Sequence, residues 1–225
     1  MMISPESYYE EYLSGRTKEQ IMSAIRGLKQ EIGRLKNSME NPNFSQVEVM
    51  HPSEYTRLDL TREYLKRAKQ AYAEAGGTYA LSKSEKRSAD FNSNIDFICK
   101  INFSIGGFFG GYRKYTIELT DELKVHAKIW DLEEPLYLFD EEGEFITKEN
   151  FIALLSTIHL EEWRRNYTTQ RFGYEVFDGT QWELEVKYNN GRKPVRFSGS
   201  NAYPYNFERF KALLEIEDAI DAENA

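Results

Sequence analysis

The stretch FICKINFSIGGFFGGYRKYTIELTDELKVHAKI, residues 97–129, decides the fold, because apolar side chains recur in it at every second position. Successive side chains point to opposite faces of a β-strand, so this period of two predicts strands with one buried face. Turn-forming residues at 106–111 and 120–122 divide the stretch into three strands of an antiparallel meander. The alternating apolar positions are Ile101, Phe103, Ile105, Tyr115, Ile117, Leu119, Val125, Ala127 and Ile129.

Upstream of this stretch the apolar residues recur every three or four positions, which predicts helices. A first helix begins after the N-cap Thr17, with Gln20 completing a capping box, and ends before Pro42. A second helix begins at Ser53 and ends near Gly76, and we expect the two to pack as an antiparallel hairpin.

A third, shorter helix is expected over residues 82–95, before the strands begin. After the strands, an acidic loop at residues 131–144 leads to a helix that is capped by Thr147 and extends to Tyr167. Strands at 172–177 and 181–188, a third strand after the turn at 190–191, and a helix near 207–214 complete the expected elements.

The dipeptide Asn190-Gly191 indicates a β-hairpin whose register can be predicted. Val186 then faces Val195 and Leu184 faces Phe197 on the core side, while Glu185 faces Arg196 on the polar side. Pro194 cannot donate a ladder hydrogen bond, so we expect either an edge strand or a loop longer than two residues.

The pattern predicts an α+β fold, with an N-terminal helical hairpin followed by an antiparallel β-meander domain with two helices, in the order βββα-βββα. We expect a helical region at residues 1–95, an antiparallel α+β domain at 96–217 and an acidic tail at 218–225. The repeated order suggests a divergent internal duplication, which the residue identities do not support.

Composition bounds the class of protein. The chain of 225 residues is 40% hydrophobic and 14% aromatic, which is typical of a folded protein. Its net charge of -8 makes nucleic-acid binding an unfavoured hypothesis. Cys99 is the single cysteine, and we see neither a secretory signal nor an apolar run of the ~20 residues that a membrane helix needs, so we expect a cytoplasmic protein.

Catalytic motifs are weak throughout. His51, His126 and His159 are scattered and lack metal-ligand spacing, so no metal and no cofactor are expected. His159 and Glu162 could form an acid/base pair, although a local polar contact is the preferred interpretation. Cys99 is expected to be a buried structural thiol.

One group of aromatic and polar residues is a candidate binding site, because Trp, Tyr and Arg often anchor interfaces and pockets. The alternative is that its two tryptophans are core residues and its Asp and Asn are turn formers. The candidate residues are Trp163, Arg164, Tyr167, Asp178, Gln181, Trp182, Asn201 and Tyr203.

Four segments carry a resemblance: YYEEYL at residues 8–13, SIGGFFGG at 104–111, DGTQWELE at 178–185 and GSNAYPYNF at 199–207. With these segments the chain resembles uncharacterised bacterial proteins, a domain of unknown function, over most of its length. The resemblance implies a bacterial cytosolic setting and no known activity, substrate or cofactor.

The function expected from the sequence is a non-enzymatic protein-interaction module whose partner is another protein. The alternative is a small-ligand binder or an unrecognised enzyme that uses the candidate residues above. A third hypothesis, an acidic inhibitor that mimics nucleic acid, depends on the acidic loop at 131–144. The sequence does not indicate an oligomeric state.

Overall fold

The computed structural model describes residues 3–44, 52–107, 110–140, 143–176 and 178–216. The chain divides into two compact units, Met1–Ser82 and Lys83–Ala225. The third expected helix is α4 (Lys83–Asn92) and belongs to the second unit, so the division comes before this helix rather than after it. The expected tail at 218–225 lies outside the described residues.

The first unit is a helical hairpin, as the sequence predicts. Its long helices are α2 (Lys18–Met39) and α3 (Glu54–Glu74), preceded by α1 (Pro5–Tyr8) and the turn η1 (Tyr9–Leu13). Thr17 and Gln20 form the expected capping box of α2. Its small core consists of Leu13, Ile21, Ile25, Ala68 and Ala71.

The hairpin is antiparallel. Ile25, in the first half of α2, packs in one core with Ala68, in the second half of α3. Further along α2, the Glu31 carboxylate lies 3.2 Å from the guanidinium of Arg57, near the start of α3.

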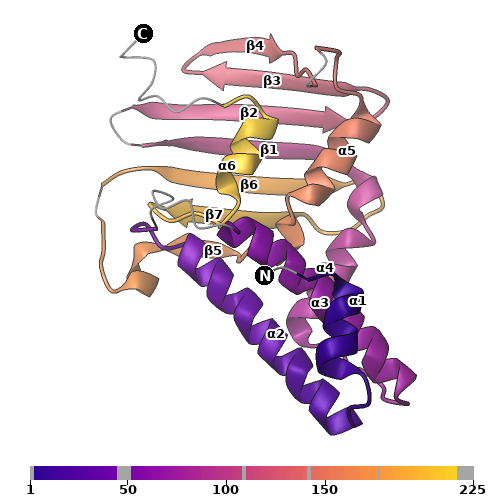
Figure 1. The fold of residues 1–225 in the computed structure, drawn as a ribbon. Helices are drawn as coiled ribbons and strands as arrows, with labels where there is room; N and C mark the ends of the chain where they lie inside the picture. The colour runs from indigo at the N-terminus through magenta and orange to yellow at the C-terminus, as the bar shows by residue number, and fades with distance from the viewer. Residues whose placement is uncertain (1–2, 45–51, 108–109, 141–142, 177, 217–225) are drawn as a thin grey trace. The chain divides into compact units, whose positions relative to one another are not determined.

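The second unit is built on a seven-stranded sheet with the order β4-β3-β2-β1-β6-β7-β5 (Figure 1). Strands β1 to β4 form an antiparallel meander in sequence order, and β1 also pairs with β6. The strands are β1 (Ile98–Gly107), β2 (Gly111–Leu119), β3 (Leu123–Ile129), β4 (Leu132–Leu136), β5 (Asn166–Thr168), β6 (Gln181–Tyr188) and β7 (Val195–Ser200).

The three predicted strands of the meander are confirmed, and a fourth was missed. The segment expected to be an acidic loop contains β4, which pairs Leu132 with Ile129 across a two-residue connection. The first strand order is therefore ββββα and not βββα.

The predicted hairpin register of β6 and β7 is correct: Val186 lies opposite Val195, and Glu185 opposite Arg196. The ladder ends at the pair Val186 and Val195. The loop is therefore longer than Asn190-Gly191, and Pro194 lies outside the ladder. The prediction of a strand at 172–177 is wrong for residues 172–176, which form no strand. The 3-10 turn η4 (Thr169–Phe172) ends at the first of them, and Phe177 lies outside the described residues. The extra strand is instead β5, which pairs in parallel with β7.

Two helices, α5 (Lys148–Thr157) and α6 (Phe207–Leu213), lie against one face of the sheet (Figure 1). Thr147 caps α5 as predicted, but the helix ends at Thr157 instead of reaching Tyr167. The reason is His159, whose φ of 57° is left-handed and cannot continue an α-helix. A short 3-10 turn, η3 (Leu160–Glu162), follows.

Candidate functional site

Three of the eight candidate residues lie in the core of the second unit. The side chains of Trp163, Tyr167 and Trp182 are each 1% exposed. The Trp163 and Trp182 rings meet edge to face, with centroids 5.8 Å apart. These aromatic residues therefore stabilise the fold and are not walls of an open pocket.

Asp178 and Asn201 lie close together, but in a turn. Asn201, at φ 50°, accepts a hydrogen bond at Oδ1 from the N–H of Thr180 (2.8 Å). Its Nδ2 donates to the carbonyl of Asp178 (3.3 Å). Gly179 is required between them, because a Cβ there would lie 2.1 Å from Asn201 Oδ1.

The other three candidates are dispersed. Tyr203 is half-buried and packs on Phe207, with ring centroids 4.9 Å apart. Gln181 accepts a hydrogen bond from the Tyr112 hydroxyl (3.2 Å), and Arg164 is exposed. The structure thus joins three aromatic candidates in the core, joins Asp178 and Asn201 in a turn, and leaves the other three apart.

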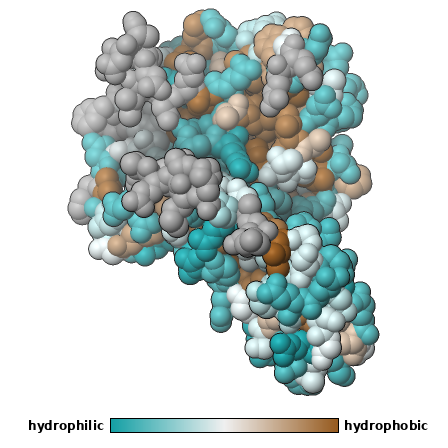
Figure 2. Space-filling model, viewed as in Figure 1, coloured by the Kyte–Doolittle hydropathy of each residue, from teal (hydrophilic) through white to brown (hydrophobic). Residues whose placement is uncertain are grey.

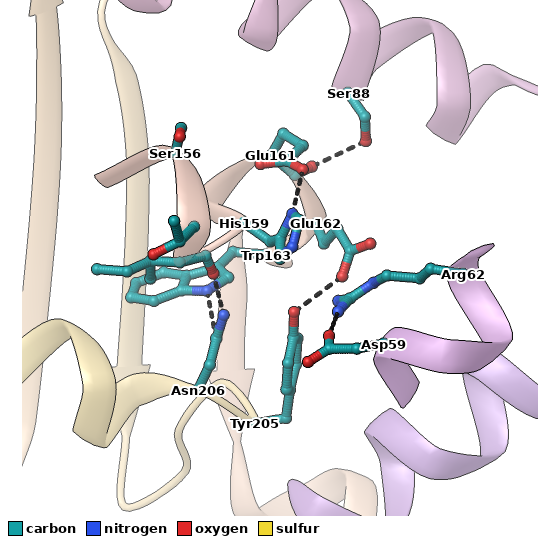
Figure 3. A network of polar contacts seen from close by, with 12 residues as sticks. Asp59, Arg62, Ser88, Ser156, His159, Glu161, Glu162, Trp163, Tyr205 and Asn206 are labelled. Carbon is teal, nitrogen blue, oxygen red and sulfur yellow. Dashed lines mark hydrogen bonds and ion pairs between the residues drawn. The ribbon is translucent and has the colours of Figure 1, made fainter. Parts of the chain in front are cut away.

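His159 immediately precedes the turn η3, which carries Glu161 and Glu162 (Figure 3). His159 Nδ1 lies 3.0 Å from a carboxylate oxygen of Glu161, and not of Glu162. Glu162 instead accepts a hydrogen bond from the Tyr205 hydroxyl (2.9 Å). The expected pairing of His159 with Glu162 is therefore replaced by two separate polar contacts.

These three side chains could hold a cation, since one ligand atom from each of His159, Glu161 and Glu162 lies within 4.8 Å of the others. The hydrogen bonds just described already engage all three groups. A local polar network accounts for this geometry without an ion.

The remaining histidines and Cys99 form no such group in the described chain. His126 lies on β3, opposite Pro135 of β4, and His51 lies outside the described residues. Cys99 is half-buried, and its Sγ donates weakly to the Lys187 carbonyl (3.6 Å).

Exposed apolar side chains accumulate around β4, at one edge of the sheet. We call them the Trp130 edge. Figure 2 shows brown, hydrophobic atoms between teal ones along the upper rim, where Figure 1 places β3 and β4. Its members and their exposed fractions are Ile129 43%, Trp130 72%, Leu132 63%, Tyr137 59%, Phe139 45% and Phe145 64%.

The Trp130 edge has two parts, one at each end of β4. At the first, Ile129 and Leu132 lie opposite each other, and the Trp130 ring covers Gly111, where a Cβ would come within 3.3 Å of it. At the second, Phe145 contacts two other rings: its centroid lies 4.9 Å from that of Phe139 and 5.9 Å from that of Tyr137.

Acidic residues accompany this apolar surface. Glu133 and Glu134 lie on β4 itself and are exposed, and Asp131 precedes the strand. This edge is not predicted by the sequence pattern, because its many acidic residues are typical of a loop, although Leu132, Leu136 and Leu138 recur there at intervals of four and two residues.

No helix in the described part of the chain is both long and apolar enough to span a bilayer. Comparison with protein-family models, with curated proteins and with solved structures finds no match to this chain.

Proposed function

We propose that this chain is a protein-binding module whose Trp130 edge holds an extended segment of a partner that carries basic and apolar side chains. The supporting observation is the conformation of Trp130, which is both 72% exposed and left-handed, with φ 57°. A bulky side chain is rare at positive φ, where Gly, Asn and Asp are favoured.

The conformation of Trp130 therefore lowers the stability of the folded state. The left-handed backbone costs roughly 1 kcal/mol for such a residue, and an exposed indole recovers little of the apolar burial that would offset it. Strain of this kind persists at functional sites, where the side chain is needed for an interaction. A partner that covers the indole would supply that interaction.

The backbone of β4 suggests an extended partner. In the described sheet, β4 pairs only with β3, so its other side is a free edge. A two-residue connection closes on a hydrogen-bonded pair, which here is Ile129 with Leu132, so the outward-facing backbone groups belong to Glu133 and Pro135.

Pro135 has no N–H and therefore limits main-chain pairing at this edge. The affinity must then come mainly from side chains at the two ends of β4. A segment laid along the strand would reach both ends, and its basic residues would lie beside Glu133 and Glu134.

The test uses synthetic peptides of about ten residues, long enough to cover β4 and its flanks. One alternates lysine with valine and the other glutamate with valine. Fluorescence reports on Trp130, because Trp163 and Trp182 are each 1% exposed. We expect the lysine peptide to shift the emission, to bind more weakly as salt is raised, and to bind more tightly than the glutamate peptide.

The decisive variant is Trp130→Asn. Its peptide binding is measured by calorimetry, because it lacks the Trp130 fluorescence. Asparagine tolerates positive φ, so the variant should be as stable as the parent or more stable, while peptide binding is lost. Tyr174→Asn is the matched control, because Tyr174 is a 40% exposed aromatic outside the Trp130 edge. Unchanged binding by Trp130→Asn, or equal binding of the two peptides, would refute the proposal.

A further inference from the structure

A second surface lies on the face of the same sheet that is turned away from α5 and α6. Two adjoining hollows of about 580 and 490 Å³ share Ser104, Lys114, Glu183 and Ser198. These residues alternate with core residues such as Phe103, so they point away from α5 and α6. We call the two hollows together the Ser104 groove.

The groove follows one transverse row of the sheet. Lys114 on β2 and Glu183 on β6 are each directly opposite Ser104 on β1, and Glu183 is also opposite Ser198 on β7. Neighbouring strands lie about 4.8 Å apart, so the backbones of Lys114 and Glu183 are separated by about 10 Å. The small serine between them forms the floor, and the two long charged side chains form walls.

The other charged side chains on this face of β1, β2, β6 and β7 are paired. Lys100 Nζ lies 3.0 Å from the carboxylate of Glu118. The Glu185 carboxylate receives Arg196 at 2.6 Å and Lys187 at 3.0 Å. These contacts hold the pKa of Glu185 at about 2, mainly through the hydrogen bond from Arg196.

Lys114 and Glu183 differ from these neighbours. On the described strands β2, β1, β6 and β7, they are the polar-face charges without an ion pair within 4 Å. The cross-strand neighbours of Lys114 are Ser104 and Lys128, whereas Lys128 itself also has Glu133 of β4 directly opposite it. Lys114 therefore has no acidic residue directly opposite it, and a bound anion would supply the missing opposite charge.

We infer that the Ser104 groove binds a short peptide with both termini free, its carboxylate at Lys114 and its ammonium at Glu183. The groove offers a positive and a negative group on either side of a hydroxyl floor, which complements a zwitterion. The Ser104 hydroxyl can donate to or accept from the peptide amide between the two ends.

The spacing sets the length of this ligand. The two walls are about 10 Å apart at the backbone. An extended chain spans roughly 3.3–3.6 Å per residue, so two or three residues bridge the groove.

Calorimetric titration with trialanine tests this inference. We expect Lys114→Met and Glu183→Gln each to weaken binding by about three- to tenfold, the cost of one exposed charge pair. Both side chains are exposed, so these changes should leave the unfolding midpoint nearly unchanged. Lys124→Met is the control, because Lys124 lies on the same face, on β3, but does not line the groove.

Peptides with one blocked terminus test which side chain binds which end of the ligand. N-acetyl-trialanine should bind equally to the parent and to Glu183→Gln, and trialanine amide equally to the parent and to Lys114→Met. The inference is overturned if trialanine gives no heat at about 10 mM, if Lys124→Met weakens it as much, or if acetate alone binds as tightly. Because this surface excludes Trp130, unchanged binding of the lysine peptide by Trp130→Asn would refute only the proposal for the Trp130 edge.

Discussion

Asn206→Ala should be among the most damaging single substitutions in the second unit. Asn206 is 2% exposed, and its Oδ1 accepts a hydrogen bond from Trp163 Nε1 at 2.8 Å. Its Nδ2 donates to the carbonyl of Ile158. One amide thus connects the start of α6 to the end of α5 and to the indole that follows η3 (Figure 3).

The magnitude follows from the groups left without partners. Alanine removes two hydrogen bonds, each worth about 1 kcal/mol net, and leaves the buried Trp163 N–H and the Ile158 carbonyl unsatisfied, each at about 1–3 kcal/mol. Water entering the small space would recover part of this. We expect a loss of about 2–4 kcal/mol in the free energy of unfolding.

Urea denaturation followed by far-UV circular dichroism measures this loss. Combining Asn206→Ala with Trp163→Phe closes a double-mutant cycle, for which we expect a coupling of about 1 kcal/mol. Asn166→Ala is the control, because Asn166 is exposed on β5 and should cost less than about 0.5 kcal/mol. A loss below about 0.5 kcal/mol for Asn206→Ala, or additivity in the cycle, would refute the reasoning.

Three further substitutions test other parts of the second unit by the same unfolding assay. Gly199→Ala should cost about 1–3 kcal/mol, since its Cβ would lie 2.2 Å from Trp182 Nε1, and a cost below 0.5 kcal/mol would contradict this contact. Tyr188→Phe should be neutral or stabilising, because the buried Tyr188 hydroxyl has no hydrogen-bond partner among the described residues; a clear loss of stability would show a hidden partner. The pKa of Glu185 is lowered from 4.5 to about 2, so its stabilising contribution is present above pH 4.5 and is lost as the pH falls towards 2. Glu185→Gln should lose about 1 kcal/mol near neutral pH and remove this part of the acid dependence, which identical pH profiles of the two proteins would disprove.

Sequence patterns correctly predicted the structural features that are specified by neighbouring residues. The capping box at Thr17 and the register of Val186 against Val195 both appear as expected, because a cap or a hairpin is specified within a few residues. The end of α5 was not predicted. It depends on the left-handed backbone of His159, a residue with no strong preference for ending a helix.

The two edge strands were missed for a different reason. β4 follows a turn at Trp130 that lacks the usual Asn-Gly pair, and its exposed residues show little alternation. β5 has three residues and pairs in parallel with β7, about thirty positions later, which a period of two cannot reveal. The β5 end of the sheet therefore depends on non-local contacts, whereas β4 pairs locally but lacks the turn residues that would have predicted it.

Candidate binding residues are harder to predict than strands, because their role depends on which residues lie opposite them. Glu183 and Glu185 occupy the same face of β6, two positions apart, and look equivalent in the sequence. Register places Arg196 beside Glu185, which saturates that carboxylate, and only Ser104 and Ser198 beside Glu183. One carboxylate thus becomes part of the fold, while the other keeps its capacity to bind a cationic group.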